Sequence, residues 1–213
     1  MKRTARRAAP PLLALCAGAL LSCAVIDGAP YGTVDPEPDP TSPGTFVGRV
    51  GGQHLDGQDA HVRIVSDPVL GAVQAVEITD YSPACSDYAA GVEHRGSLHL
   101  TLLVGLKTSS GVLKPTAAGP YTVFNESAAA GSQPNPGAFS IVRFSGRDAS
   151  SCAAKTSPTW SGATGTVTIG KINSTLGTID GTYDVKMASG ESISGRFSAV
   201  GCAEPGVASA TCK

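Results

Sequence analysis

The sequence contains few aromatic and few charged residues, and it lacks the short motifs that commit a chain to a known chemistry. Aromatic residues make up 5% and charged residues 15% of its 213 positions. No GxSxG, GxGxxG or Walker-type phosphate-binding pattern occurs, so neither a nucleophile elbow nor a nucleotide-binding loop is indicated. Cysteines occur in no CxxC pair, which argues against a zinc site of that spacing. Because these motifs are absent, we predict no cofactor and name no catalytic residue.

Basic residues are scarce beyond the first seven positions. Residues 1–22 contain four Lys or Arg and no acidic residue, so the rest of the chain has 12 basic against 17 acidic side chains. A net charge of about −5 offers no positive patch for a phosphate backbone. We therefore expect no nucleic acid among the partners.

An export signal occupies the start of the chain. Basic residues in positions 1–7 precede an apolar stretch over residues 8–21, as in a secretory signal peptide. A helix that spans a membrane needs roughly 20 apolar residues, so this stretch is short for that role. The segment Leu20–Cys23 resembles the lipobox of bacterial lipoproteins, whereas Leu15 makes Cys16 a poor second choice. Secretion without a lipid and an uncleaved anchor are the alternatives.

The lipobox resemblance implies how the chain is processed. In that family the leader, here residues 1–22, is removed and the cysteine, here Cys23, is acylated, with palmitate among the lipids. Two or more acyl chains hold a protein stably on a membrane. Ala24 after the cysteine implies the outer membrane of the cell envelope.

A spacer and one domain follow the predicted anchor. Residues 23–44 hold five prolines and little to bury, which predicts a stiff, solvated tether. Residues 45–202 are long enough for one β-rich domain with a core of its own. Residues 203–213 form a C-terminal tail that a disulfide could close.

Four cysteines remain once Cys16 is removed with the leader and Cys23 carries lipid. They are Cys85, Cys152, Cys202 and Cys212. In an oxidising compartment they predict two disulfides, with three possible connectivities. We favour Cys202 with Cys212, which are near in sequence, and Cys85 with Cys152.

The apolar residues of the domain recur mostly with a period of two, which is typical of half-buried strands. One short helical turn is possible over 86–92, and the clearest hairpin joins the last two strands. We predict an all-β domain, an antiparallel sandwich by preference or a partly closed barrel, of about nine short strands. The predicted strands are residues 45–50, 61–65, 72–79, 97–106, 119–124, 139–144, 165–172, 178–187 and 192–200.

The order of these strands resembles a group of small bacterial lipoproteins of unknown function. The resemblance is carried by strand and turn motifs such as Gly119–Thr122, Gly165–Ile169, Gly181–Val185 and Gly195–Ala199 before Cys202. It implies a β-rich fold and transfers no catalytic residue.

The densest polar cluster is a candidate metal site. His54, Asp56, Asp59 and His61 could offer two nitrogens and an oxygen to zinc. The alternative, which we favour, is a turn between two strands, since Arg63 would project to the same face as His61 and oppose a cation.

The other candidate residues each have a structural explanation. We expect His94 and His99 to be exposed strand residues, and Asp180 and Asp184 to share one strand face with too few oxygens for calcium. Trp160 lies in a predicted loop, where we favour core cover over a sugar or protein contact.

Function follows from the anchor, the tether and the missing motifs. We expect a non-enzymatic binding or structural module of the envelope, whose partners are the membrane and an unidentified envelope protein or glycan. The alternative is a secreted metal-dependent hydrolase.

Overall fold

Long, regular strands dominate the computed structural model, which describes residues 39, 41–68, 70–113, 115, 117–126, 134–155, 160–173, 177–203 and 211–213. The predicted leader, Cys23 and most of the predicted tether lie outside these residues. Among the described residues, no helix combines the length and apolar character needed to cross a membrane.

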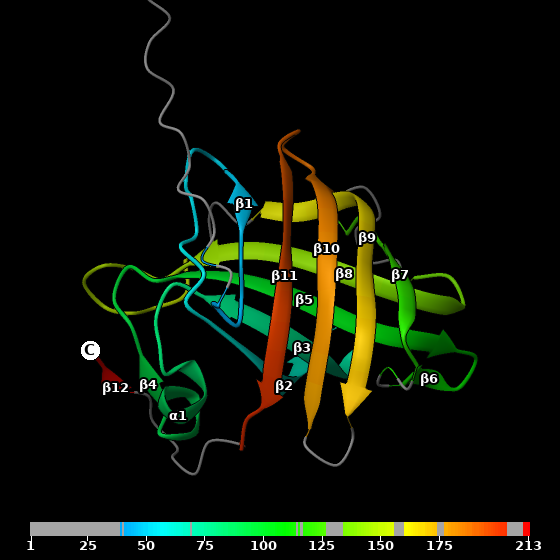
Figure 1. Ribbon diagram of the computed structural model, residues 1–213, viewed down its shortest axis with the longest axis horizontal. Helices are drawn as coiled ribbons and strands as arrows, with labels where there is room; N and C mark the ends of the chain where they lie inside the picture. Colours follow the sequence, from blue (N-terminus) through cyan, green and yellow to red (C-terminus); the bar gives the residue numbers. More distant parts are fainter. Residues whose placement is uncertain are drawn as a thin grey trace, which may run out of the picture. The chain divides into compact units, whose positions relative to one another are not determined.

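The described part of the chain contains twelve strands and one short helix, and it is all-β as predicted (Figure 1). In chain order the elements are β1 (Val47–Gly48), β2 (Asp59–Asp67), β3 (Gly71–Thr79), α1 (Ala84–Ala89), β4 (Val92–Glu93), β5 (Leu98–Thr108), β6 (Gly111–Leu113), β7 (Gly119–Val123), β8 (Gly137–Gly146), β9 (Trp160–Asn173), β10 (Thr178–Met187), β11 (Ser192–Gly201) and β12 (Thr211–Cys212).

Eight of the strands form one closed, barrel-like sheet. Its order is β2-β3-β5-β8-β7-β9-β10-β11, and β11 returns to β2 through the pairs Val200 with His61 and Gly201 with Val62. Both this pairing and that of β7 with β8 are parallel, so the sheet is mixed. Of the two predicted architectures, the structure has the barrel and not the preferred sandwich. The sequence left this open, because a period of two fixes which side chains face inward and not which distant strands pair.

The N-terminal end of the described chain runs along the seam where the sheet closes. Thr45 N donates to Arg196 O at 2.9 Å, and Ser198 N donates to Pro43 O at 2.7 Å. From inside the sheet, the Tyr183 hydroxyl donates to Thr45 O at 2.7 Å. These contacts supply backbone partners to the middle of β11, between its short pairings with β1 and β2.

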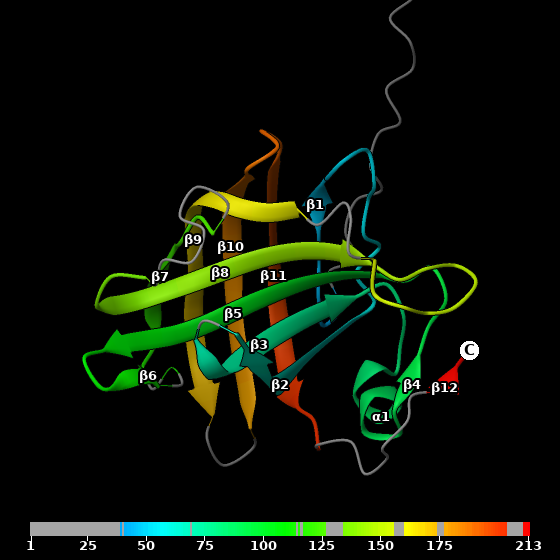
Figure 2. The same ribbon diagram turned by 180° about the vertical axis from the view of Figure 1, so that it is seen from behind.

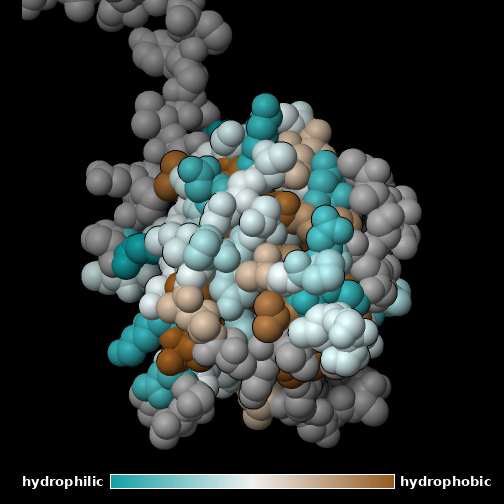
Figure 3. Space-filling view, turned by 90° about the vertical axis from the view of Figure 1, so that its right-hand side faces the viewer, coloured by the Kyte–Doolittle hydropathy of each residue, from teal (hydrophilic) through white to brown (hydrophobic). Residues whose placement is uncertain are grey.

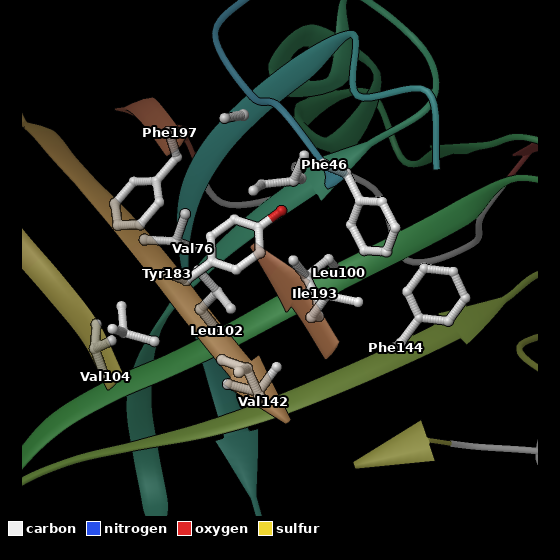
Figure 4. Close-up of a cluster of buried hydrophobic side chains, with 14 of the residues drawn as sticks. Phe46, Val76, Leu100, Leu102, Val104, Val142, Phe144, Tyr183, Ile193 and Phe197 are labelled. Atoms are coloured by element: carbon white, nitrogen blue, oxygen red, sulfur yellow. The ribbon is translucent and has the colours of Figure 1, made fainter. Parts of the chain in front are cut away.

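The interior of the sheet is filled by side chains. Val76 of β3, Leu100 and Leu102 of β5 and Tyr183 of β10 point into one apolar cluster, together with aromatic rings from the other strands (Figure 4). A second, smaller apolar cluster lies on the outer face of β3, β5 and β8 and includes Leu103 and Phe139. The filled interior leaves the outer surface as the place for a binding site.

The outer surface facing the viewer in Figure 3 is mixed in polarity. Apolar side chains lie there as separate small patches among polar ones. Large hydrophobic residues that are exposed are few among the described residues, and Ile64 and Val200 are the most exposed at 46% each. Scattered residues of this kind are normal on a folded protein and do not mark an interface.

Candidate functional site

Strand alternation places a polar cluster on the outer face of β2, β3 and β5. His61 and Glu77 are direct partners in the β2–β3 register, and His99 lies diagonally across from Glu77 on β5. Their strand neighbours Val62 and Leu100 face the core instead. Because side chains at such positions lie within contact distance across a sheet, these three residues meet.

A small cap covers this face. It consists of α1, β4 and β12, which lie together beside the sheet (Figures 1 and 2). The β4 and β12 strands pair in parallel, Thr211 with Val92 and Cys212 with Glu93. The helix starts where Ala84 N donates to the Asp59 carboxylate at 2.8 Å. The cap converts an open strand face into an enclosed one.

Two disulfides fasten the cap to the sheet. Cys85 in α1 is bonded to Cys202 just after β11, and Cys152 after β8 is bonded to Cys212 in β12. The four cysteines are paired as predicted in number, but the favoured pairing of Cys202 with Cys212 and of Cys85 with Cys152 was wrong. Cys202 lies beside α1, whereas Cys212 lies in the strand that pairs with β4. The short separation of these two cysteines in the sequence therefore did not indicate a bond between them.

Between the cap and the sheet lies a cavity of about 250 Å³. It is bounded by charged, imidazole and phenol side chains and by a short stretch of β4. The lining residues are His61, Arg63, Glu77, Tyr81, Tyr88, Gly91, Val92, Glu93, His94, His99 and Arg147.

Glu77 is the centre of the polar cluster. Its Oε2 accepts a hydrogen bond from Arg63 Nε at 2.7 Å, and its Oε1 lies 2.9 Å from His99 Nδ1. Burial alone would raise the pKa of Glu77, but its contacts with His61 and His99 and the charge of Arg63 outweigh burial and hold that pKa well below the usual range. Glu77 is therefore a buried carboxylate that stays ionised.

His61 is the least satisfied group of the cluster. Its side chain is buried, with 1% of the residue exposed, and its Nε2 lies 3.3 Å from Glu77 Oε2 without hydrogen-bond geometry. Its Nδ1 has no partner among the described residues, and its ring lies 5.9 Å from that of Tyr88. A buried polar atom without a partner is uncommon and marks a place where another molecule can bind.

The opposite wall is built from an imidazole–carboxylate contact, an ion pair and an aromatic stack. His94 Nε2 lies 2.8 Å from Asp87 Oδ2, and Arg147 Nη1 donates to Glu93 Oε2 at 2.9 Å. The ring of Tyr81 stacks on His94 with 4.0 Å between centroids. Burial, together with the negative charge of Glu77, raises the pKa of the Tyr81 phenol above its usual range, so Tyr81 is a neutral hydrogen-bond donor.

Ser97, His99 and Glu77 form a relay with the distances of a catalytic triad. The Ser97 Oγ lies 2.9 Å from His99 Nε2, and His99 Nδ1 lies 2.9 Å from Glu77. However, the Ser97 hydroxyl donates to His94 O at 2.9 Å, the residue is 5% exposed, and it does not line the cavity. A nucleophile must reach its substrate, so this relay describes a structural network.

The proposed metal ligands take up separate structural roles. His54 Nδ1 contacts Gly48 O at 2.9 Å, Asp59 holds the start of α1, and Asp56 is exposed. His61 faces Glu77 instead, on the same side of β2 as Arg63, as expected. Within the described part of the chain, no three His, Cys, Asp or Glu side chains are arranged to hold a metal ion.

Several other expectations were wrong. His99 is buried rather than exposed, because the cap covers its strand face. His94 follows β4 instead of lying in a strand, and it is partly buried against Asp87 and Tyr81. Trp160 begins β9 rather than lying in a loop, but it packs against the core as favoured, 5.8 Å from the Phe144 ring. Asp180 accepts a hydrogen bond from Ser198 at 2.7 Å, across the β10–β11 pair.

Sequence reasoning missed Glu77, Tyr81 and Arg147. One signal was present for Glu77, which is the single charged residue in the apolar strand Gly71–Thr79, between strands that each carry a histidine. Comparison of the chain with known proteins adds no site residues. No protein-family model matches the chain, and neither the curated proteins nor the solved structures include a significant match.

Proposed function

We propose that this chain is a lipid-anchored protein of the bacterial cell envelope whose β domain is a non-enzymatic binding module. The leader and the lipobox-like segment ending at Cys23 support the anchor, and the residue after it supports the outer membrane. The tether would carry the domain away from the membrane, where an envelope glycan, protein or small molecule could reach the cavity.

One observation carries the binding role. His61 lies in the wall of the cavity under the cap, and its buried ring nitrogens have no hydrogen-bond partner among the described residues. A polar network kept for stability alone would be expected to satisfy its members, because an unpaired buried group costs about 1–3 kcal/mol. A bound ligand would supply the missing partner, and a concave site with convergent polar groups is the kind of place where a small polar ligand binds.

Binding is favoured over catalysis by the state of the polar side chains. The hydroxyl of Ser97 is engaged by His94 O, and the carboxylate of Glu77 is held by Arg63 and His99. Neither group is offered to the cavity as a free nucleophile or as an uncharged acid.

The anchor is tested by the intact mass of protein extracted from membranes. The parent chain should start at Cys23 and exceed the bare polypeptide by the mass of its acyl groups. Cys23→Ala should lose the lipidated form, whereas Cys16→Ala, the matched control, should keep it. A parent without acyl groups, or lipid that persists in Cys23→Ala, would overturn the anchor.

The binding role is tested by thermal unfolding of the purified full chain with a panel of small polar compounds. The panel holds hexoses, amino acids, dipeptides and hydroxy acids. At least one class should raise the unfolding midpoint in a concentration-dependent way, since a ligand that binds only the folded state stabilises it. No response to any class, or turnover of substrates in a broad hydrolase panel, would refute a non-enzymatic binding module.

A further inference from the structure

The chemistry of the ligand can be argued from the groups that still face the cavity, beginning with Arg147. Its Nη1 donates to Glu93 Oε2 at 2.9 Å and to Cys152 O at 3.3 Å. Its Nε and Nη2 have no partner among the described residues, and its side chain is one quarter exposed. That free edge is the fork by which a guanidinium binds a carboxylate with two parallel hydrogen bonds.

The second unpartnered group in the cavity wall is the buried imidazole of His61. The imidazole contacts Glu77 on β3 and the ring of Tyr88, and Glu77 in turn is held by Arg63 on β2 and by His99. An imidazole nitrogen can donate or accept a hydrogen bond, so a hydroxyl, which can also do both, suits it as a partner.

The acids of the cavity are already engaged, which disfavours a cationic ligand. Glu77 contacts Arg63 and His99, and Glu93 is paired with Arg147. The remaining open group is the Tyr81 hydroxyl, which makes no hydrogen bond within the described residues and can donate to an oxygen. The rings of Tyr81 and Tyr88 add apolar walls on which a carbon skeleton can lie.

Building on the binding role above, we propose that the cavity takes a compact hydroxycarboxylate. The carboxylate pairs with the free edge of Arg147, and a hydroxyl of the same ligand lies against the Tyr81 hydroxyl and the His61 imidazole. The volume of about 250 Å³ is below the range of drug-sized sites, so the ligand is small or is the end of a larger molecule. A free hydroxy acid and a uronic acid at the end of a glycan present the same chemistry.

Titration calorimetry of the full chain with matched probes tests this ligand class. Lactate and glucuronate carry both groups, propionate carries only the carboxylate, and glucose carries only hydroxyls. Lactate should bind at least about tenfold more tightly than propionate, or glucuronate at least about tenfold more tightly than glucose. Propionate lacks the hydroxyl and glucose lacks the carboxylate, so each leaves one polar group of the cavity without a hydrogen-bond partner. A galacturonate oligosaccharide distinguishes a glycan end from a free hydroxy acid. If the oligosaccharide binds more tightly than glucuronate, the ligand is the end of a glycan.

Two variants complete the test. Arg147→Lys should weaken binding about tenfold or more, because an ammonium lacks the fork. Arg143→Lys is the matched control, since the Arg143 guanidinium is similarly half-buried but is engaged by Glu126 and Asp67 outside the cavity. It should stay within about twofold of the parent.

Specific outcomes would overturn the proposal. One is glucose or propionate binding as tightly as the hydroxycarboxylates, and another is failure of both hydroxycarboxylates to bind. These comparisons use the parent chain, so they do not depend on the folding of a variant. If another class of compound binds in the cavity while the hydroxycarboxylates do not, the binding role stands and the ligand class falls. If nothing binds, both fall.

Discussion

Nε2 of His61 and Oε2 of Glu77 lie 3.3 Å apart across the β2–β3 pair, and both side chains are more than nine-tenths buried. Side chains of this kind usually point to solvent on the outer face of a closed sheet. Here a cap held by two disulfides covers them, and Arg63 and His99 both contact the Glu77 carboxylate. The arrangement has consequences for stability that differ from those of an exposed ion pair.

Glu77→Gln should destabilise the domain at neutral pH by about 3 kcal/mol, since it breaks a buried ion pair and leaves the Arg63 charge without its carboxylate. Denaturant unfolding at pH 7 measures this difference. Asp184→Asn is the matched control, because that carboxylate is exposed on β10, and its effect should stay within about 0.5 kcal/mol. Equal effects of the two substitutions would contradict a structural role for Glu77.

The same carboxylate predicts a pH dependence. The pKa of Glu77 in the folded domain lies below the ordinary value of 4.5. Its stabilising charge is therefore fully present above pH 4.5 and is lost as the pH falls from there toward the folded-state pKa. Unfolding free energies measured from pH 5 to pH 3 should fall less steeply in Glu77→Gln than in the parent. Parallel slopes would contradict the lowered pKa.

The disulfide framework predicts which cysteine peptides stay linked. Non-reducing digestion and mass spectrometry should recover Cys85 with Cys202 and Cys152 with Cys212, and thiol titration should find no free thiol among the four. The double change Cys152→Ser with Cys212→Ser should cost about 4 kcal/mol, because it opens a loop with a sequence separation of 60. Recovery of Cys202 linked to Cys212 would contradict the framework.

Closure of the sheet depends on Gly195. A Cβ at this position would lie 2.1 Å from Thr45 O and 2.5 Å from the Tyr183 hydroxyl, where the seam is hydrogen bonded. Gly195→Ala should therefore lower stability by about 2 kcal/mol or more, as overpacking does. Gly170→Ala on the neighbouring β9 is the control, since its Cβ would meet one atom at 3.7 Å. Thermal unfolding of both variants measures the difference. If the unfolding midpoint of Gly195→Ala is no lower than that of Gly170→Ala, the seam does not require glycine at position 195.

Much of the fold could be predicted from the sequence because strand alternation is a local signal. Each of the nine predicted strands overlaps an observed one, and the hairpin of β10 and β11 lies where it was expected. The missed strands β4, β6 and β12 have two or three residues, too few to show a period. The parallel closure of β11 on β2 could not be inferred, since no local pattern encodes a pairing of distant strands.

The candidate site was harder to predict, because long-range contacts assemble it. His61 and His99 were noticed, but alternation alone implied that His99 would be exposed. The cap that buries them combines α1 and β4 with β12 near the end of the chain, and disulfides join it to Cys152 and Cys202. Which cysteines pair decides where the cap lies, and spacing along the sequence did not reveal that pairing.

If a ligand binds in the cavity under the cap, as we propose, the four histidines of the chain report its binding directly. His61, His94 and His99 line the cavity, whereas His54 contacts Gly48 outside it and serves as an internal reference. Imidazole NMR spectra of the full chain should be recorded during titration with lactate, glucuronate and any compound that raises the unfolding midpoint. We predict saturable shifts of the three cavity histidines, with one common dissociation constant, and no shift of His54. Stabilisation without any shift of the cavity histidines, or with His54 shifting alike, would contradict the account.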